Sequence, residues 1–129
     1  MEQKSIKQQA KSYFLPLILG NSKNSRKLAS KVFRQCGITS FLLDFKRSPI
    51  NIFGFSYYFV ELTATKNDRL LCEQLIDLAR QNPSALPILV PASVDYQRAI
   101  EENRDLLERY FIISKPERLF IDSPLATVI

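Results

Sequence analysis

Two kinds of hydrophobic pattern follow one another along this chain. Short segments that are apolar on both faces are typical of strands buried in a parallel sheet. Longer segments with an apolar residue every three or four positions are typical of helices that bury one face. The short segments predict strands over residues 13–19, 38–45, 55–63, 86–90 and 111–113.

Capping residues set the expected limits of the helices. The predicted helices run from Asn21 or Ser22 to about Gln35, from Asn67 or Asp68 to about Gln81, from Ser93 or Asp95 to about Tyr110, and from Pro116 onward. Gly37 is a natural C-terminal cap for the first of them. The inner stripe of the long third helix is expected to consist of Ala99, Ile100, Asn103, Leu106, Leu107 and Tyr110.

The order strand, helix, strand, strand, helix, strand, helix, strand predicts an α/β fold in three layers. We expect a mainly parallel sheet of four or five strands with helices on both faces. Pro16 has no N–H for the ladder, so the well-paired part of the first strand is expected to begin at Leu17. The pattern predicts one domain over residues 13–122, a basic tail over 1–12, and a C-terminal tail over 123–129.

Composition narrows the class of protein. The chain has 129 residues, of which 46% are hydrophobic and 24% charged, as in an ordinary soluble domain. No apolar run approaches the roughly 20 residues that span a bilayer, and Met1–Ser12 has no apolar signal core, so a cytoplasmic location is expected. There is no histidine, and Cys36 and Cys72 are not in a Cys-x-x-Cys spacing. We therefore expect two buried free thiols and no metal site.

Positive charge is concentrated at the N-terminal end. Residues 1–35 hold eight Lys/Arg and one Glu, whereas residues 36–129 hold ten Lys/Arg and twelve Asp/Glu. A basic segment of this kind suits nucleic acid, anionic lipid or an acidic ligand. Because no interleaved aromatic residues or RNA-binding signature accompany the charge, a nucleic-acid partner is disfavoured. A solvated tail and the outer face of one helix explain the charge more simply.

Ligands of open parallel sheets collect beyond the carboxyl ends of the strands. That rule selects residues 20–22, Asp44, residues 63–65 and residues 91–93. A glycine followed by a helix N-terminus at residues 20–22 suits an anion or a carboxylate. However, neither Gly-x-Gly-x-x-Gly nor Gly-x-x-x-x-Gly-Lys-Ser/Thr is present, so a plain strand-to-helix turn remains the alternative.

Asp44 follows Gly20 by 24 residues, near the interval at which an acidic residue binds ribose hydroxyls in dinucleotide sites. A solvated or capping aspartate is the alternative. The charged run over residues 95–109 is best explained as an outer helix face with i,i+3 and i,i+4 ion pairs. Ser93 has no histidine partner, and no catalytic residue is predicted.

Three stretches, taken in order, resemble the N-terminal, pre-ATP-grasp domain of ATP-grasp carboxylate–amine ligases, particularly the D-aspartate ligase type. They are residues 15–22 (LPLILGNS) with Asn24 and Ala29, residues 53–62, and residues 86–93 (LPILVPAS) followed by 103–107 (NRDLL) and Tyr110-Phe111. The resemblance covers about residues 13–122. It departs from the family at Val94, where an aspartate is usual before Asp95, and at Lys27, where a small residue is common.

The resemblance implies a Rossmann-like, pre-ATP-grasp fold and a supporting role in positioning a small carboxylate or amino-acid substrate, without catalysis by this chain alone. The implied substrate-binding residues are Gly20, Asn21, Ser22, Asp44, Pro91, Ser93 and Asp95. ATP and Mg²⁺ are expected only with ATP-grasp domains, whose lysines and acidic ligands are not among these 129 residues. The implied partner is an ATP-grasp domain in another chain, or a second copy.

A competing hypothesis is a stand-alone Rossmann-like module that binds a small anionic ligand or nucleotide at residues 20–22. The ligase hypothesis also predicts an apolar surface around Leu119, Phe120 and Ile121 that awaits a partner. The carboxylate, the amine, the oligomeric state and the question of fragment or stand-alone protein all stay open at this point.

Overall fold

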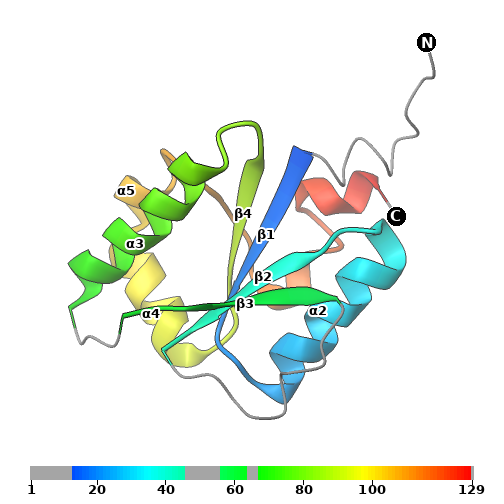
Figure 1. The fold of residues 1–129 in the computed structure, drawn as a ribbon, viewed down its shortest axis with the longest axis horizontal. Coiled ribbons are helices and arrows are strands. Elements are labelled where there is room, and N and C mark those ends of the chain that lie inside the picture. Colours follow the sequence, from blue (N-terminus) through cyan, green and yellow to red (C-terminus); the bar gives the residue numbers. More distant parts are fainter. Residues whose placement is uncertain (1–12, 46–55, 64–66, 129) are drawn as a thin grey trace.

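A five-stranded, all-parallel sheet forms the centre of the molecule (Figure 1). The computed structural model describes residues 13–45, 56–63 and 67–128. In spatial order β3-β2-β1-β4-β5, the strands are β3 (Tyr57–Glu61), β2 (Ser40–Asp44), β1 (Phe14–Leu19), β4 (Leu86–Pro91) and β5 (Ile112–Ile113). The predicted order of strands and helices and the parallel three-layer α/β class are confirmed.

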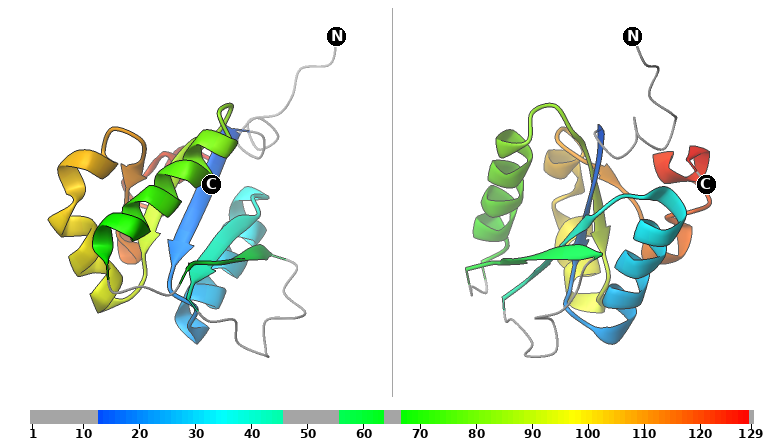
Figure 2. Two further views of the ribbon diagram at one scale, coloured as in Figure 1. Left: turned by 60° about the vertical axis from the view of Figure 1, so that its left-hand side comes forward. Right: turned by 45° about the vertical axis from the view of Figure 1, so that its right-hand side comes forward.

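Helices cover both faces of the sheet (Figure 2). One face packs against α2 (Lys23–Cys36), and the other against α3 (Asp68–Gln81), α4 (Val94–Glu102) and α5 (Arg104–Leu107). Successive β1 side chains point to opposite faces, so Ile18 lies in the core beneath α2 while Leu17 and Leu19 lie in the core beneath α3 and α4. All three are fully buried, as expected for a central strand.

Pro16 and Pro87 lie within paired strands, in register with Ile88 and Leu15. The prediction that pairing begins at Leu17 is correct on the β2 side and wrong on the β4 side, where it begins at Phe14. The Gly20 N–H donates to Leu43 on β2, so by alternation the N–H position of residue 16 also faces β2. Pro16 therefore lacks an N–H on the side of β2, one residue before β1 and β2 begin to pair at Leu17.

Pro87 follows the same rule on β4. The Leu89 carbonyl accepts from the Ser114 N–H beyond β5, so residue 87 also faces β5, whose pairing starts only at Ile88. Each proline therefore occupies a position at which the adjacent strand has not yet begun to pair, so the missing N–H costs no hydrogen bond of the sheet.

The helix limits follow their capping residues. The side chains of Ser22, Asn67 and Ser93 accept hydrogen bonds from backbone N–H groups in the first turns of α2, α3 and α4. Gly37 ends α2 in the left-handed region at φ 70°. Sequence analysis gave two candidates at each of these starts, and the structure selects these three residues.

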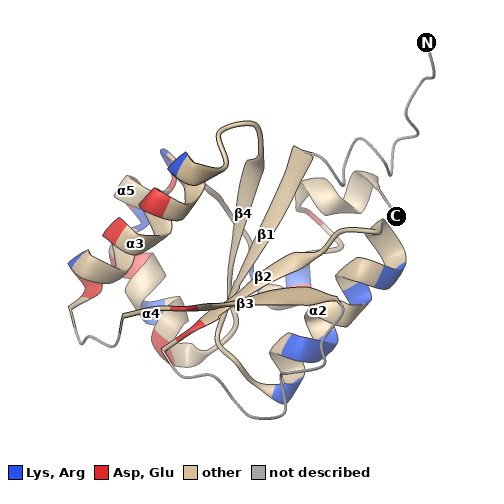
Figure 3. Cartoon of the chain, viewed as in Figure 1, with Lys and Arg blue, Asp and Glu red and all other residues tan. Residues whose placement is uncertain are grey.

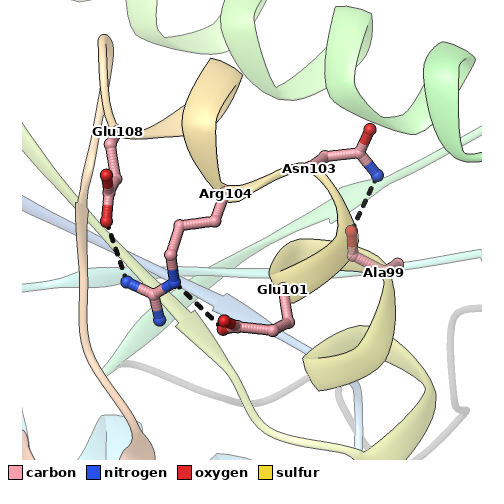
Figure 4. Close-up of polar contacts among 5 residues, drawn as sticks. All are labelled: Ala99, Glu101, Asn103, Arg104 and Glu108. Atoms are coloured by element: carbon pink, nitrogen blue, oxygen red, sulfur yellow. Dashed lines mark hydrogen bonds and ion pairs between the residues drawn. The ribbon is translucent and has the colours of Figure 1, made fainter.

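The predicted long helix to Tyr110 is wrong, because it is broken at Asn103 (Figure 4). The Asn103 side-chain amide donates to the Ala99 carbonyl at 2.8 Å, as Figure 4 shows. Leu107 is fully buried in the core and Leu106 is 41% exposed, so the predicted inner position of Leu106 is also wrong. Arg104 bridges Glu101 and Glu108 across the break, which confirms the predicted ion-paired outer face.

The end of the described chain packs beside α2. The turns η2 (Pro116–Arg118) and η3 (Pro124–Thr127) bring Leu119, Leu125 and Val128 into the core on this face. The predicted apolar docking surface is therefore wrong at Leu119, which is fully buried, and only Ile121 of that trio is largely exposed. The segment from Ser123, which has no clear sequence pattern, contributes buried leucine and valine side chains to the domain.

Other predictions concern the cysteines, the membrane and the tail. Cys36 and Cys72 are buried and are not joined in a disulfide, as expected. Within the described ranges, the structure has no helix with the length and apolar character that crossing a bilayer requires. The predicted basic tail over 1–12, the first residue of the predicted strand over 55–63, Ala64 and Thr65 lie outside the described residues.

Candidate functional site

The strand order reverses between β1 and β4, and their carboxyl ends form one end of the sheet. The chain leaves β1 toward α2 on one face and leaves β4 toward α4 on the other, which opens a crevice between the two turns. A Cβ placed on Gly20 would lie 3.8 Å from the Ser93 Cβ, so the two turns are in contact. The Ala92 N–H also donates to the Leu19 carbonyl at 2.8 Å.

Gly20 is required at this contact by its backbone. Its φ of 114° lies in a region that residues with a Cβ rarely adopt. Space is not the reason, because an added Cβ would meet nothing closer than Tyr96 Cδ2 at 3.7 Å. The glycine therefore sets the direction of the turn that leads into α2.

Asp44 joins three segments at this end of the sheet. Its Oδ2 accepts from the Asn21 N–H at 2.7 Å, and its Oδ1 accepts from the Phe45 N–H and the Tyr96 hydroxyl, both at 2.8 Å. The carboxylate thus ties the turn after β1, the end of β2 and the first turn of α4 to one another. Hydrogen bonds to a charged group are stronger than neutral ones, so this connection holds the crevice rigidly.

The same bonds bear on anion binding at residues 20–22. The Asn21 N–H donates to the internal Asp44 carboxylate, and the Ser22 hydroxyl oxygen accepts from the Ser25 N–H at 3.1 Å. The Asn21 side-chain oxygen accepts from Arg26 at 3.1 Å. An external phosphate or carboxylate that used the Asn21 N–H would have to displace Asp44, so the geometry supports the anion-module hypothesis less well at this donor than the sequence does.

Tyr96 is the residue that sequence reasoning missed. It is only 8% exposed, and its ring stacks on Phe45 with centroids 5.9 Å apart. Burial, and then the hydrogen bond to Asp44, raise the pKa of the Tyr96 hydroxyl well above its usual value, so the group stays a neutral donor. Its one sequence signal is helical spacing with the buried Ala99 and Ile100.

A cleft of about 590 Å³ opens beyond Asp44, between the first turns of α3 and α4. Asp44, Ser93 and Asp95 line it together with Asp68 and Arg98. Of the other predicted substrate-binding residues, Gly20, Asn21 and Ser22 form the neighbouring turn, and Pro91 is buried at the end of β4. The structure therefore brings all seven predicted residues to one end of the sheet, but only three of them face this cleft.

The cleft carries both signs of charge. Asp68 and Asp95 lie in the first turns of α3 and α4, where helix dipoles favour carboxylates. Arg98 lies one turn further along α4 and also pairs with Glu102 at 3.3 Å. A small ligand with an ammonium group and a carboxylate therefore has a partner of opposite charge for each end.

The hydroxyl groups near the cleft are engaged in the fold. The Ser93 oxygen caps α4 by accepting from the Tyr96 N–H, and the Tyr96 hydroxyl donates to Asp44. Among residues 13–45, 56–63 and 67–128, no group of three or more His, Cys, Asp or Glu side chains is arranged to hold a metal ion.

Comparison of the chain with protein-family models, with curated proteins and with solved structures finds no match.

Proposed function

We propose that this chain is a pre-ATP-grasp-like, substrate-positioning domain of a carboxylate–amine ligase, which does not catalyse a reaction by itself. In this proposal the α3–α4 cleft holds a small amino acid or related carboxylate. The motifs at residues 15–22, 86–93 and 103–107 suggest the family, and the fold is compatible with it.

The observation that carries the proposal is the charged cleft at the carboxyl end of the sheet. Asp68 and Asp95 offer carboxylates for an ammonium group, and Arg98 offers a guanidinium for a carboxylate. The network of Asp44 with Asn21 and Tyr96 fixes the walls before any ligand arrives. A preformed site loses less conformational entropy on binding, which suits a domain whose task is to orient a substrate.

Activation of the carboxylate belongs to other domains in this proposal. Those domains would supply the lysines that bind ATP and the acidic residues that bind Mg²⁺, and they would sit in a separate chain or a further part of the protein. The hydroxyls of Ser93 and Tyr96 serve the fold through hydrogen bonds, which supports a positioning role.

Isothermal titration calorimetry on the full chain tests the proposal. D-aspartate, L-aspartate and other small amino acids are titrated separately, and MgATP is titrated alone. We expect saturable binding of at least one amino acid and no binding of MgATP. Asp95→Asn should weaken that binding about tenfold, because an ammonium–carboxylate pair is lost; a tenfold change corresponds to about 1.4 kcal/mol.

Asp105→Asn is the matched control. Asp105 lies exposed in the first turn of α5 and is not among the residues that line the cleft. Its substitution removes the same charge and should leave amino-acid binding unchanged. ATP hydrolysis by the chain alone, or amino-acid binding that both variants weaken equally, would contradict the proposal.

A further inference from the structure

α2 carries the positive charge of the described fold, as Figure 3 shows. It has five Lys/Arg and no Asp/Glu, whereas the other described residues have seven Lys/Arg and twelve Asp/Glu. The helix lies on the face of the sheet opposite α3, α4 and the amino-acid cleft proposed above. The face of the sheet that α2 covers is therefore positively charged, whereas the rest of the described fold has a net negative charge.

These five cations have no acidic partner among the described residues. Every ion pair between described side chains involves an arginine outside α2. Arg26 donates to the Asn21 side chain, Arg34 donates to the Ser30 carbonyl, and Lys31 Nζ lies 4.7 Å from the centroid of the Phe120 ring. Glu117 lines a groove beside Lys27 and Lys31, but five cations outnumber this one carboxylate, so the potential of this face remains positive.

The cations are arranged along a line. Lys23, Lys27 and Lys31 are four residues apart, and Lys23 to Arg34 spans about 16 Å of helix axis. A groove of about 490 Å³ beside α2 is lined by Lys27, Lys31, Gln97 and Glu117. A second, shallow hollow of about 710 Å³ follows the outer face and shares Lys27 and Lys31 with the groove. We call these two hollows and their five cations the α2 surface.

Two aromatic rings lie near this charge, and one of them, Phe33, stands between Lys31 and Arg34 in the sequence. Phe33 is 40% exposed on α2, and Phe120 from the turn after η2 is half-buried beneath Lys31. Phe33 is therefore the one exposed ring of α2, on the same helix as the row of cations. A base can stack on such a ring while lysines contact the phosphates of a single strand.

We propose that the α2 surface binds the phosphate backbone of a single-stranded nucleic acid. A row of separate cations suits several successive phosphates better than one compact anion. A membrane would require a broad apolar strip, whereas Phe33 is the one large hydrophobic side chain of α2 that is exposed. The proposal does not depend on the proposed ligase role, because it concerns the opposite face.

Fluorescence anisotropy with a labelled 12-nucleotide single strand tests this assignment on the full chain. We expect binding at 50 mM NaCl that weakens with salt, with a slope of log K against log [NaCl] between about −2 and −3.5; this corresponds to three to five neutralised phosphates. The double variant Lys27→Gln/Lys31→Gln should bind at least about tenfold more weakly and lower the slope by about 1.4, since two contacts are lost.

Arg80→Gln/Arg109→Gln is the charge-matched control. Arg80 lies in the last turn of α3 and Arg109 in the turn after α5; both are exposed, and removing them lowers the net charge by the same amount. Affinity in this variant should change less than about twofold, whereas Phe33→Ala should weaken the single-strand complex by at least about fivefold through lost stacking.

Three results would overturn the proposal: no salt-dependent binding, equal losses in the two double variants, or equal affinity for poly-glutamate of the same charge. The last result would assign the surface to an acidic protein instead. Full displacement of the strand by an equal concentration of phosphate groups added as inorganic phosphate would reassign it to a small anion.

Discussion

Asp44 shows how one side chain serves as an internal ligand of the fold. It lies where a parallel sheet would place a residue that binds substrate, yet it accepts hydrogen bonds from Asn21, Phe45 and Tyr96. A carboxylate held by two backbone groups and a buried hydroxyl shapes the crevice and gives up part of its capacity for external ligands.

Removing the Tyr96 hydroxyl tests the strength of this arrangement. Tyr96→Phe keeps the ring stacked on Phe45 but removes a hydrogen bond to a charged acceptor, so we expect a loss of about 1.5–3 kcal/mol in the free energy of unfolding at pH 7. Urea denaturation measures this. A loss below about 0.5 kcal/mol would show that water replaces the hydroxyl without cost.

The wild type and the Tyr96→Phe variant should also differ in how their free energy of unfolding changes in alkaline solution. The folded pKa of Tyr96 is raised above its usual value of 10.0, so its contribution is complete below pH 10 and declines as pH rises above it. The wild type should lose up to about 1.4 kcal/mol per pH unit more than the phenylalanine variant in this range. A difference between the two proteins that stays constant across this pH range would argue against a buried, hydrogen-bonded hydroxyl.

Local chemistry is predictable from the sequence at this scale, and long-range chemistry is not. Ser22, Gly37 and Ser93 are recognisable because capping acts within a few residues. The Tyr96–Asp44 hydrogen bond joins residues 52 positions apart, and no spacing rule reveals it. The sequence therefore places Asp44 at the carboxyl end of its strand, but it does not predict which groups donate hydrogen bonds to its carboxylate.

At the scale of elements, the break between α4 and α5 decides which leucine is inside. A continuous helix would present Leu106 and Leu107 about equally to the core. The interruption at Asn103 instead buries Leu107 completely. The sequence pattern is compatible with one long helix, because both leucines fit its apolar stripe and Asn103 carries no obligatory break signal.

A matched pair of substitutions checks this correction. Leu107→Ala should lower the free energy of unfolding by about 2–5 kcal/mol, because it leaves a cavity in the core. Leu106→Ala should cost less than about 1 kcal/mol, since that side chain is largely solvated and alanine favours helix. Chemical denaturation of both variants provides the comparison, and similar losses would favour the continuous helix.

At the scale of the whole molecule, the last described segment completes the layer that contains α2. Leu119, Leu125 and Val128 pack with Ile18 and Val32 against the sheet. Sequence analysis could not assign this role, because two short turns lack the period of a helix or strand. The apolar residues of these turns are buried only because they pack beside α2, which lies about one hundred residues earlier in the chain.

Removing one of these anchors should destabilise the entire domain. Leu125→Ala should lower the free energy of unfolding by about 2–5 kcal/mol through loss of buried volume. Ile121→Ala, three residues before Pro124, is the control, because Ile121 is 62% exposed and its loss should cost less than about 1 kcal/mol. If the two variants melt alike in a thermal scan, the segment is not part of the cooperative core.

Pro16 and Pro87 have an effect that reaches beyond the folded chain. They stand where β1 and β4 extend past the paired parts of β2 and β5, and both proline side chains are buried in the folded domain. In a chain that is only partly folded, a foreign strand that paired with either segment would find one donor missing from the ladder. The two prolines thus guard against cross-chain pairing while this end of the sheet is still exposed during folding.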